Sequence, residues 1–537
     1  MKPERGKVHV SLFALLRRHH VLSSLPLKGQ AHKRAIIRNG EKVSENQIAS
    51  VLQPQKRALY QNIGLVLGPV LAVLVFVLPP PAGLSDDAWI VVALAVWMAS
   101  WWAVEAIPVP ATSLLPLIVL PLAGVTSAAD ASRPFAEPVI FLLLGGFVMA
   151  MAMQRWGLHK RIALHIVARS GDRPGALILG FMVATALLSM WVSNTATCLM
   201  MLPIALMVTK TVLGDKADRH PFGLALVLGI AWSASIGGLG TIIGTPPNAF
   251  VVGFVRETQG VEIAFIQWMA FGVPVVAVMI PTAWFVLTRL SFRFAADDVH
   301  GGHAVVTGAL VDMGRMSTAE KRVALVFAMA GGAWALRLLL NDLPGLAYLS
   351  DMNIAIAGAL AMFLVPAGKG QKDGAHPQAA LLDWDQAARL PWGVLLLFGG
   401  GLSLAAAIRT TGLAQWMGNG LAPLTDFPLI FLIGAIVLLI IFLTELTSNT
   451  ATVAALVPIL GSIADVSGFA PILLAAPAAM AGSSAFMLPV ATAPNAIVYA
   501  SGQIRIPDMV KAGFRLNLLG TLVITVLCWW IVPVLFG

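Results

Sequence analysis

Two identical pentads of small polar residues stand inside apolar stretches of the chain. Ser-Asn-Thr-Ala-Thr occupies residues 193–197, within MWVSNTATCLMMLPI, and again residues 448–452, within ELTSNTATVAALVPI. Hydroxyl and amide side chains supply neutral oxygen ligands and hydrogen-bond donors. They also cap helices and form tight local turns. Side chains of this kind favour the binding of small ions.

The apolar stretches around both pentads are almost free of charge. Lys, Arg, Asp and Glu are absent from 174–208, and Glu445 is the one charged residue in 427–462. An anion bound beside the pentads would therefore meet no lysine or arginine, and bound sodium ions are the expected counter-charge. Glu445 is a functional candidate because a carboxylate is costly inside a membrane. Its counterpart beside the first pentad is Met190, so Glu445 is no part of a symmetric site.

Two further apolar stretches are interrupted by GTPPNA at 244–249 and ATAPNA at 491–496. Proline removes a backbone donor and frees a carbonyl group upstream. Each stretch is therefore expected to be a helix that is unwound at its centre. A pentad facing such a break would form a cage of hydroxyl, amide and carbonyl oxygens, which suits sodium, and half-helix N-termini at the same place favour an anion.

The pentads and breaks belong to an internal repeat. A shift of 255 residues superimposes the pentads and takes Ser189 onto Thr444, and a shift of 247 takes Thr245 onto Thr492. The first Gly-Gly helix is followed by five basic residues: Arg155, Lys160, Arg161, Arg169 and Arg173. The matching region of the second half has Arg409 alone. Basic residues mark the cytoplasmic side of a membrane protein. The two halves are therefore expected to be inverted, as in many secondary transporters.

The composition defines a membrane protein. Hydrophobic residues make up 58% of the 537 residues and charged residues 11%, about half the share of a soluble domain. The mean hydropathy is +0.84. Apolar runs near the ~20 residues that span a bilayer recur along the chain. An all-α polytopic membrane protein is expected, and the net charge of +9 is attributed to cytoplasmic loops rather than to nucleic-acid binding.

Three regions are expected along the chain. The first is a basic cytoplasmic tail at 1–58. The first half covers 59–320, with a re-entrant hairpin at 175–210 and a broken helix at 222–253. The second half covers 321–537, with a hairpin at 427–462 and a broken helix at 470–503. The hairpins are expected because each stretch is too long for one span and polar at its middle.

The pentads and breaks, together with PWGVLLLFGGG and MLPVATAPNAIVYASGQI, closely resemble the divalent anion–sodium symporter family from about residue 60 to the C-terminus. The resemblance implies about eleven transmembrane helices and two re-entrant hairpins in an inverted repeat. It implies a scaffold domain and a transport domain that moves as an elevator. It also implies a homodimer in the plasma membrane, with a cytoplasmic N-terminus and an external C-terminus. The cargo would be sodium with C4-dicarboxylates such as succinate, fumarate or malate.

The resemblance also implies the ligand sets, residue by residue. One sodium site would use Ser189, Ser193, Asn194 and the Gly244 backbone, and a second would use Thr444, Ser448, Asn449 and the Ala491 backbone. The anion would contact Asn194, Thr195, Thr245, Ser448, Asn449, Thr450 and Thr492.

Other functions stay open at this point. Within transporters, the alternatives are a sulfate or tricarboxylate carrier coupled to sodium, or a sodium-independent dicarboxylate exchanger. The resemblance implies symport rather than exchange, because exchangers of that family carry cationic side chains in place of sodium ligands and both pentads here are intact. A membrane-embedded hydrolase would need an activated nucleophile or a metal site. No HExxH or G-x-S-x-G at a helix start supports one, so the chain is not expected to be an enzyme. A channel is disfavoured, since closed oxygen cages suit occlusion.

Overall fold

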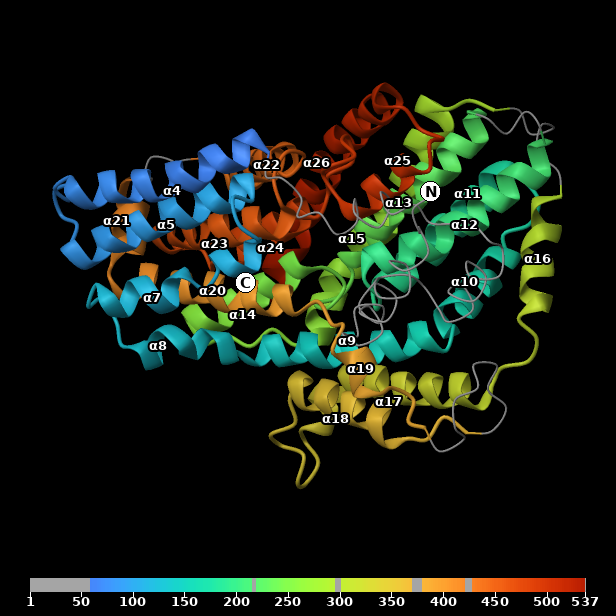
Figure 1. Cartoon of the computed structure of the whole chain (residues 1–537), viewed down its shortest axis with the longest axis horizontal. Coiled ribbons are helices and arrows are strands. Elements are labelled where there is room, and N and C mark those ends of the chain that lie inside the picture. The colour runs from blue at the N-terminus through green and yellow to red at the C-terminus, as the bar shows by residue number, and fades with distance from the viewer. Residues whose placement is uncertain (1–57, 215–218, 295–300, 369–378, 421–426, 537) are drawn as a thin grey trace, which may run out of the picture. The chain divides into compact units, whose positions relative to one another are not determined.

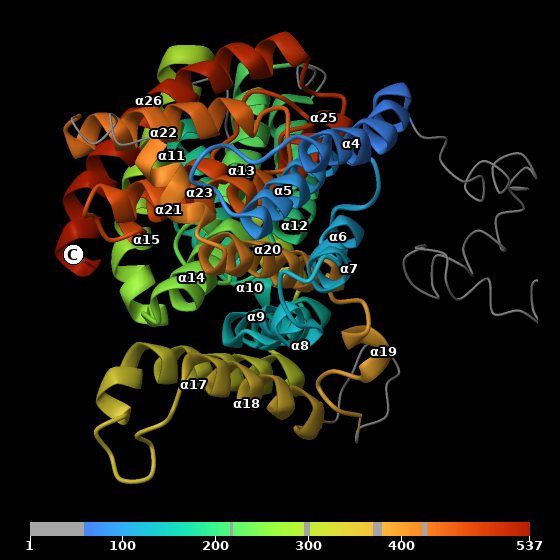
Figure 2. The same cartoon turned by 90° about the vertical axis from the view of Figure 1, so that its left-hand side faces the viewer.

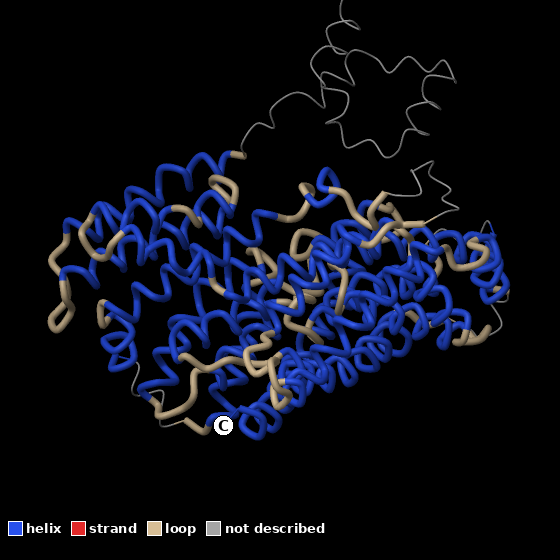
Figure 3. Tube along the Cα trace, turned by 90° about the horizontal axis from the view of Figure 1, so that it is seen from below, coloured by secondary structure: helices blue, strands red, loops and turns tan. Residues whose placement is uncertain are grey.

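The computed structural model describes residues 58–214, 219–294, 301–368, 379–420 and 427–536. Within these ranges the regular structure is helical and contains no strand (Figure 3). Ten of the described helical segments are long and apolar enough to cross a membrane, and shorter apolar helices accompany them. The expected all-α polytopic membrane fold is confirmed. The basic tail expected at 1–58 lies outside the described residues, apart from Ala58.

The first half begins with two long helices, α4 and α5. Its later part contains the helix pair α11–α12, the broken helix α13–α14 and the long helix α15 (Figure 1). Its elements are α4 (Leu59–Val77), α5 (Asp86–Val104), α6 (Val109–Thr112), α7 (Leu115–Leu122), α8 (Ala128–Ser132), η2 (Arg133–Ala136), α9 (Pro138–Arg155), α10 (Leu158–Ala168), α11 (Pro174–Ser189), α12 (Asn194–Leu213), α13 (Pro221–Gly238), α14 (Pro246–Gln259), α15 (Phe265–Phe285), the π-helical η4 (Val286–Ser291) and α16 (Gly302–Asp312). A single apolar stretch supplies both α6 and α7. Pro116 divides them, because it has no N–H to bond the carbonyl of Thr112.

The second half repeats the order of α9–α15 from α20 onwards, after the three helices α17, α18 and α19. Its elements are α17 (Thr318–Leu340), α18 (Asp351–Leu364), α19 (Trp384–Ala387), α20 (Trp392–Thr410), α21 (Leu413–Gly420), α22 (Leu429–Leu443), α23 (Asn449–Val466), α24 (Ile472–Gly482), α25 (Ala493–Ala500) and α26 (Ile506–Phe536). The pairs α11–α12 and α22–α23 are the two helix pairs whose turns hold the pentads. The pairs α13–α14 and α24–α25 are the two broken helices.

Two groups of helices are distinguished by their packing. α17 and α18 lie side by side along α9 and are seen as a separate layer in Figures 1 and 2. The approach of α18 to α9 is close, because a Cβ at Gly145 would lie 2.5 Å from the backbone of Ala355. The helix pairs and broken helices pack on one another and on α15 and α26, and they also contact α9, α10, α20 and α21. The polar tips therefore lie within this second group.

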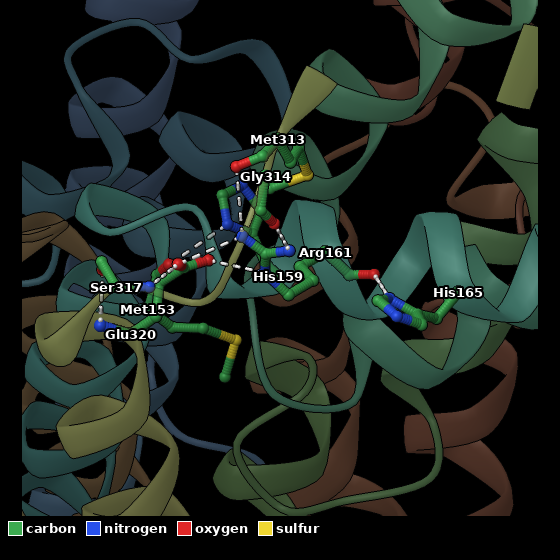
Figure 4. A network of polar contacts seen from close by, with 8 residues as sticks. All are labelled: Met153, His159, Arg161, His165, Met313, Gly314, Ser317 and Glu320. Carbon is green, nitrogen blue, oxygen red and sulfur yellow. Dashed lines mark hydrogen bonds and ion pairs between the residues drawn. The ribbon is translucent and has the colours of Figure 1, made fainter. Parts of the chain in front are cut away.

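A buried ion pair joins α10 to the first turn of α17 (Figure 4). Arg161 Nε donates to Glu320 Oε1 at 2.9 Å, and its Nη2 donates to Oε2 at 3.2 Å. Arg161 Nη1 also donates to the carbonyl of Gly314 at 2.8 Å. Glu320 completes a capping box with Ser317 at the start of α17. One guanidinium therefore fixes the connection that leads from the first half into the second.

The same figure shows His159 at the start of α10, with its Nδ1 3.2 Å from the carbonyl of Met153. Burial lowers the pKa of the His159 imidazole below its ordinary value. The imidazole is therefore neutral near pH 7 and adds no charge beside Arg161.

Candidate functional site

The first pentad forms the turn between α11 and α12. α11 ends at Ser189, and Ser193 caps α12 by accepting a hydrogen bond from the N–H of Ala196 at 3.3 Å. Serine is favoured at this position because its side-chain oxygen replaces a missing backbone acceptor. Asn194 is then the first residue of α12, and its side chain lies beside the turn. The second pentad is placed in the same way, with Ser448 before α23 and Asn449 as its first residue.

Each helix break is held open by an asparagine. Asn248 Nδ2 donates to the carbonyls of Gly238, Leu239 and Thr241, at 3.0, 3.3 and 2.8 Å. Asn495 Nδ2 donates to the carbonyls of Ala485 and Leu488, at 3.2 and 3.1 Å. The repeat shift of 247 residues takes Asn248, Gly238 and Thr241 onto Asn495, Ala485 and Leu488. Both breaks therefore use the same side chain to satisfy carbonyls that the unwound backbone leaves without helical partners.

Neutral oxygens converge between the first pentad and the first break. Ser189 Oγ lies 2.6 Å from Asn194 Oδ1 and 2.6 Å from the carbonyl of Ala234. A hydroxyl has one hydrogen, so it can donate to one of these two acceptors at a time. Asn194 Oδ1 and the carbonyl of Gly244 each lie 3.0 Å from the point where a Cβ on Gly238 would stand. Asn194 Nδ2 lies 3.3 Å from the same point, so Gly238 leaves a small space beside two oxygen atoms and the Asn194 amide nitrogen.

The side chains at the second pentad make different hydrogen bonds from those at the first. Thr444 Oγ1 donates back into α22, 3.0 Å from the carbonyl of Ile440, and does not line the cavity described below. Asn449 Oδ1 is buried without a hydrogen-bond partner in the described part of the chain. Ser448 makes no capping hydrogen bond with its side chain. Ser448, Asn449 and Thr450 all line the cavity, so their side-chain oxygens are available to a ligand at this tip.

The two repeats meet across their breaks. Thr245 Oγ1 and Ser483 Oγ lie 3.1 Å apart, although 238 residues separate them. Cys198 Sγ, on α12, lies 3.7 Å from the carbonyl of Pro494 at the start of α25. α12 contacts both α13 and α25, and α23 contacts both α24 and α14. Each helix that follows a pentad therefore packs on the broken helices of both repeats.

A cavity of about 1040 Å³ collects these groups. Every residue expected to contact the anion lines it: Asn194, Thr195, Thr245, Ser448, Asn449, Thr450 and Thr492. Of the residues expected to bind sodium, Ser193 and the backbones of Gly244 and Ala491 also line the cavity, whereas Ser189 and Thr444 are fully buried behind it.

The cavity has the polarity of an anion site, and neither the pentads nor the helix breaks contribute a basic side chain to it. The N-termini of α12, α14, α23 and α25 all begin at lining residues, and helix N-termini carry partial positive charge. Among the described lining residues, Glu105 and Arg389 carry charge, and neither belongs to a pentad or a helix break. The arrangement can bind an anion through N–H groups and hydroxyls, with cations held by the oxygens around it.

Several polar residues of the site were not predicted. Ser235 and Thr447 line the cavity, and Ser483 bonds Thr245 across the repeats. Ser235 gives no signal in the sequence, because a serine within an apolar helix often bonds only its own backbone. The sequence does indicate Asn248 and Asn495, because they match each other in the repeat and each follows a proline.

Comparisons with known proteins agree on the family. The model of the sodium:sulfate symporter transmembrane region matches residues 60–536. The sodium-dependent dicarboxylate transporter SdcS of Staphylococcus saprophyticus is 42% identical over 484 residues, which cover 89% of this chain and 92% of that protein. SdcS of Staphylococcus aureus strain USA300 is 40% identical over the same length. The crystal structure of the Alcanivorax borkumensis YdaH transporter is similar in fold, with a TM-score of 0.52 at 18% identity, covering 88% of this chain and 96% of that one.

A helical membrane protein with two polar tips and two helix breaks around one cavity is a secondary transporter rather than an enzyme. The chain belongs to the sodium:sulfate symporter family, because the family model matches nearly all of the described residues.

Proposed function

We propose that the protein is a sodium-coupled symporter that imports divalent organic anions, with C4-dicarboxylates such as succinate, fumarate and malate as its substrates. The relatives at 40–42% identity are named sodium-dependent dicarboxylate transporters, and they align with 89% of this chain. The observation that carries the proposal is the cavity, in which two neutral pentads and four helix N-termini face one another without a lysine or arginine from either motif.

The anion lies between the two pentads in this proposal. Asn194, Thr195 and Thr245 contact one carboxylate, and Ser448, Asn449, Thr450 and Thr492 contact the other. A C4-dicarboxylate has a carboxylate at each end, which suits two equivalent polar tips. Hydroxyl, amide and backbone N–H donors bind each carboxylate without a basic side chain, as helix N-termini do for other anions.

Two sodium ions supply the missing positive charge. The first is held by Ser189, Ser193, Asn194 and the Gly244 carbonyl, and the second by Thr444, Ser448, Asn449 and the Ala491 carbonyl. The oxygens around Gly238 support the first site. The unpartnered Oδ1 of Asn449 supports the second. Thr444 reaches its ion by turning its hydroxyl away from Ile440, which is a rotation about one side-chain bond. The ions and the anion thus stabilise one another, so neither binds tightly alone.

In this proposal one group of helices carries the bound anion across the membrane by moving against the other group. α11–α15 and α22–α26 form the moving transport domain, and α4–α10 and α17–α21 form the scaffold, which also holds the partner in a homodimer. The cavity is lined by the first turn of α4, the end of α5 and the residues before α20. With the N-terminus in the cytoplasm and the C-terminus outside, this is the inward-facing state in the plasma membrane.

Sulfate is a second candidate substrate, because the matching family model is named for sodium and sulfate. A sulfate ion is smaller than a C4-dicarboxylate and would reach one tip at a time. Competition between anions therefore separates the two candidates.

Uptake into proteoliposomes tests the proposal. Purified protein should accumulate labelled succinate under an inward sodium gradient, and choline in place of sodium should abolish the uptake. Unlabelled fumarate and malate should compete, while sulfate should compete weakly. Equal uptake in choline would refute sodium coupling. Stronger competition by sulfate than by fumarate would replace dicarboxylates with sulfate as the substrate.

A further inference from the structure

Glu445 lies in the turn between α22 and α23, directly before the second pentad, and only 3% of its surface is exposed. Four N–H groups surround its carboxylate. Oε1 accepts hydrogen bonds from the backbone of Phe486 at 2.7 Å and of Met487 at 2.8 Å, and from Asn517 Nδ2 at 2.8 Å. Oε2 accepts from the backbone of Leu488 at 2.9 Å. A buried carboxylate with this many donors is firmly held in place.

Three of these donors belong to the unwound backbone between α24 and α25. An unwound segment inside the membrane leaves N–H groups without helical acceptors, and each costs free energy unless another group accepts its hydrogen bond. Glu445 supplies that acceptor for three consecutive residues. The fourth donor, Asn517 on α26, is itself fully buried and donates to the same carboxylate oxygen as Phe486 and Met487.

The first repeat makes the same connection by different chemistry. Met190 is the counterpart of Glu445 and Thr241 the counterpart of Leu488, by the two repeat shifts. In the first repeat the hydroxyl of Thr241 donates to the carbonyl of Met190 at 2.5 Å. In the second repeat the N–H of Leu488 donates to the side chain of Glu445. Both hydrogen bonds join the turn of a helix pair to the same position of the facing break.

We propose that Glu445 is the positioning residue of the second sodium site. By holding residues 486–488 against the turn, it fixes where the carbonyl of Ala491 and the side chain of Thr492 stand relative to Ser448 and Asn449. This inference rests on the proposed sodium coupling. In the second repeat the side chain of Glu445 joins the turn to the break, whereas in the first repeat the backbone carbonyl of Met190 does so. Substitution of Glu445 should therefore affect its sodium site more than substitution of Met190 affects the other.

Glu445→Gln tests the proposal, because the amide keeps the shape but turns an NH₂ group towards N–H donors. The sodium concentration for half-maximal succinate uptake should rise by about tenfold. Since sodium and anion binding are coupled, the succinate KM should rise at low sodium and return to the wild-type value at saturating sodium. A purely structural loss would lower the maximal rate and the amount of folded protein instead, without this split.

Two further variants complete the experiment. Asp465→Asn makes the same chemical change at an exposed position of α23, and it should leave sodium dependence unchanged. Asn517→Ala removes one of the four donors and retains the carboxylate, so it should raise the sodium requirement by roughly threefold. If Glu445→Gln is not recovered as folded protein, Asn517→Ala decides the question.

The proposal is overturned if Glu445→Gln has the same sodium requirement as the wild type. If only Asn517→Ala folds, a wild-type sodium requirement in that variant overturns it. The same outcome should be sought in sodium-dependent thermal stabilisation of the purified protein without substrate. Failure of the proposed function looks different, because the wild-type protein itself would then show no dependence on sodium.

Discussion

Gly238→Ala places a methyl group beside two oxygens of the proposed first sodium site, Asn194 Oδ1 and the carbonyl of Gly244. Gly238 is the last residue of α13 and is not among the glycines with positive φ, so alanine fits its backbone. The new Cβ would stand 3.0 Å from Asn194 Oδ1 and 3.0 Å from the carbonyl of Gly244. One or both of these oxygens must move away, and the space for the ion is lost.

The magnitude follows from the two displaced ligands. If each contributes as much as a neutral hydrogen bond, about 0.5–1.5 kcal/mol, the loss is about 1–3 kcal/mol. Sodium affinity at this site should therefore fall by roughly fivefold to 150-fold. The fold itself should not lose stability through its backbone, because alanine is the better helix former by about 1 kcal/mol.

The assay is a sodium titration of succinate uptake, together with sodium-dependent thermal unfolding of the purified protein. Gly229→Ala is the matched control, since it lies in the same helix and its Cβ would stand 3.0 Å from the flexible side chain of Met182. Gly229→Ala should keep the wild-type sodium requirement. A wild-type sodium requirement in Gly238→Ala would show that no ion is bound between these oxygens.

Three further predictions concern other parts of the molecule. Thr492→Ala should weaken anion binding by roughly tenfold and spare sodium binding without substrate, whereas Asn449→Ala should weaken both, as calorimetry would show. A cysteine replacing exposed Lys160 should react with an impermeant maleimide only from the cytoplasm, and one replacing exposed Gln415 only from outside. Arg161→Ala should destabilise the protein by about 3 kcal/mol, seen as earlier thermal unfolding, because a buried carboxylate loses its partner.

Each of these has an outcome that contradicts it. Wild-type sodium binding in the Asn449→Ala protein would make the second pentad an anion site alone. Labelling of both cysteines from one side would reject the inverted repeat. Unchanged thermal stability in Arg161→Ala would show that the ion pair between Arg161 and Glu320 does not stabilise the fold.

The tips and breaks were predictable because a polar residue in an apolar stretch has few uses. Residues 174–213 form two helices joined by the first pentad, where the sequence predicts a re-entrant hairpin at 175–210. Residues 472–482 and 493–500 are helical, where it predicts a broken helix at 470–503. Hydropathy and proline fix such features locally. The confirmed helical membrane fold follows from the same signals.

Side-chain orientation could not be predicted. Ser189 and Thr444 match in the repeat, yet Ser189 contacts Asn194 while Thr444 bonds its own helix. A hydroxyl in a helix always has the carbonyl one turn earlier as an alternative acceptor, so residue type does not decide between the two. The donors around Glu445 were equally hidden, because three of them are backbone groups about 40 residues away in the chain.

The hydrogen bond between Thr245 and Ser483 has a consequence for how the protein is made. The ribosome adds about 5–20 residues per second, so the 238 residues between them take roughly ten to fifty seconds to synthesise. During that time the first break has been synthesised, but the helices of the second repeat that cover it have not. Its exposed polar backbone is unstable in lipid. The nascent first half must therefore be sheltered by insertion machinery, or remain outside the bilayer, until its second half arrives.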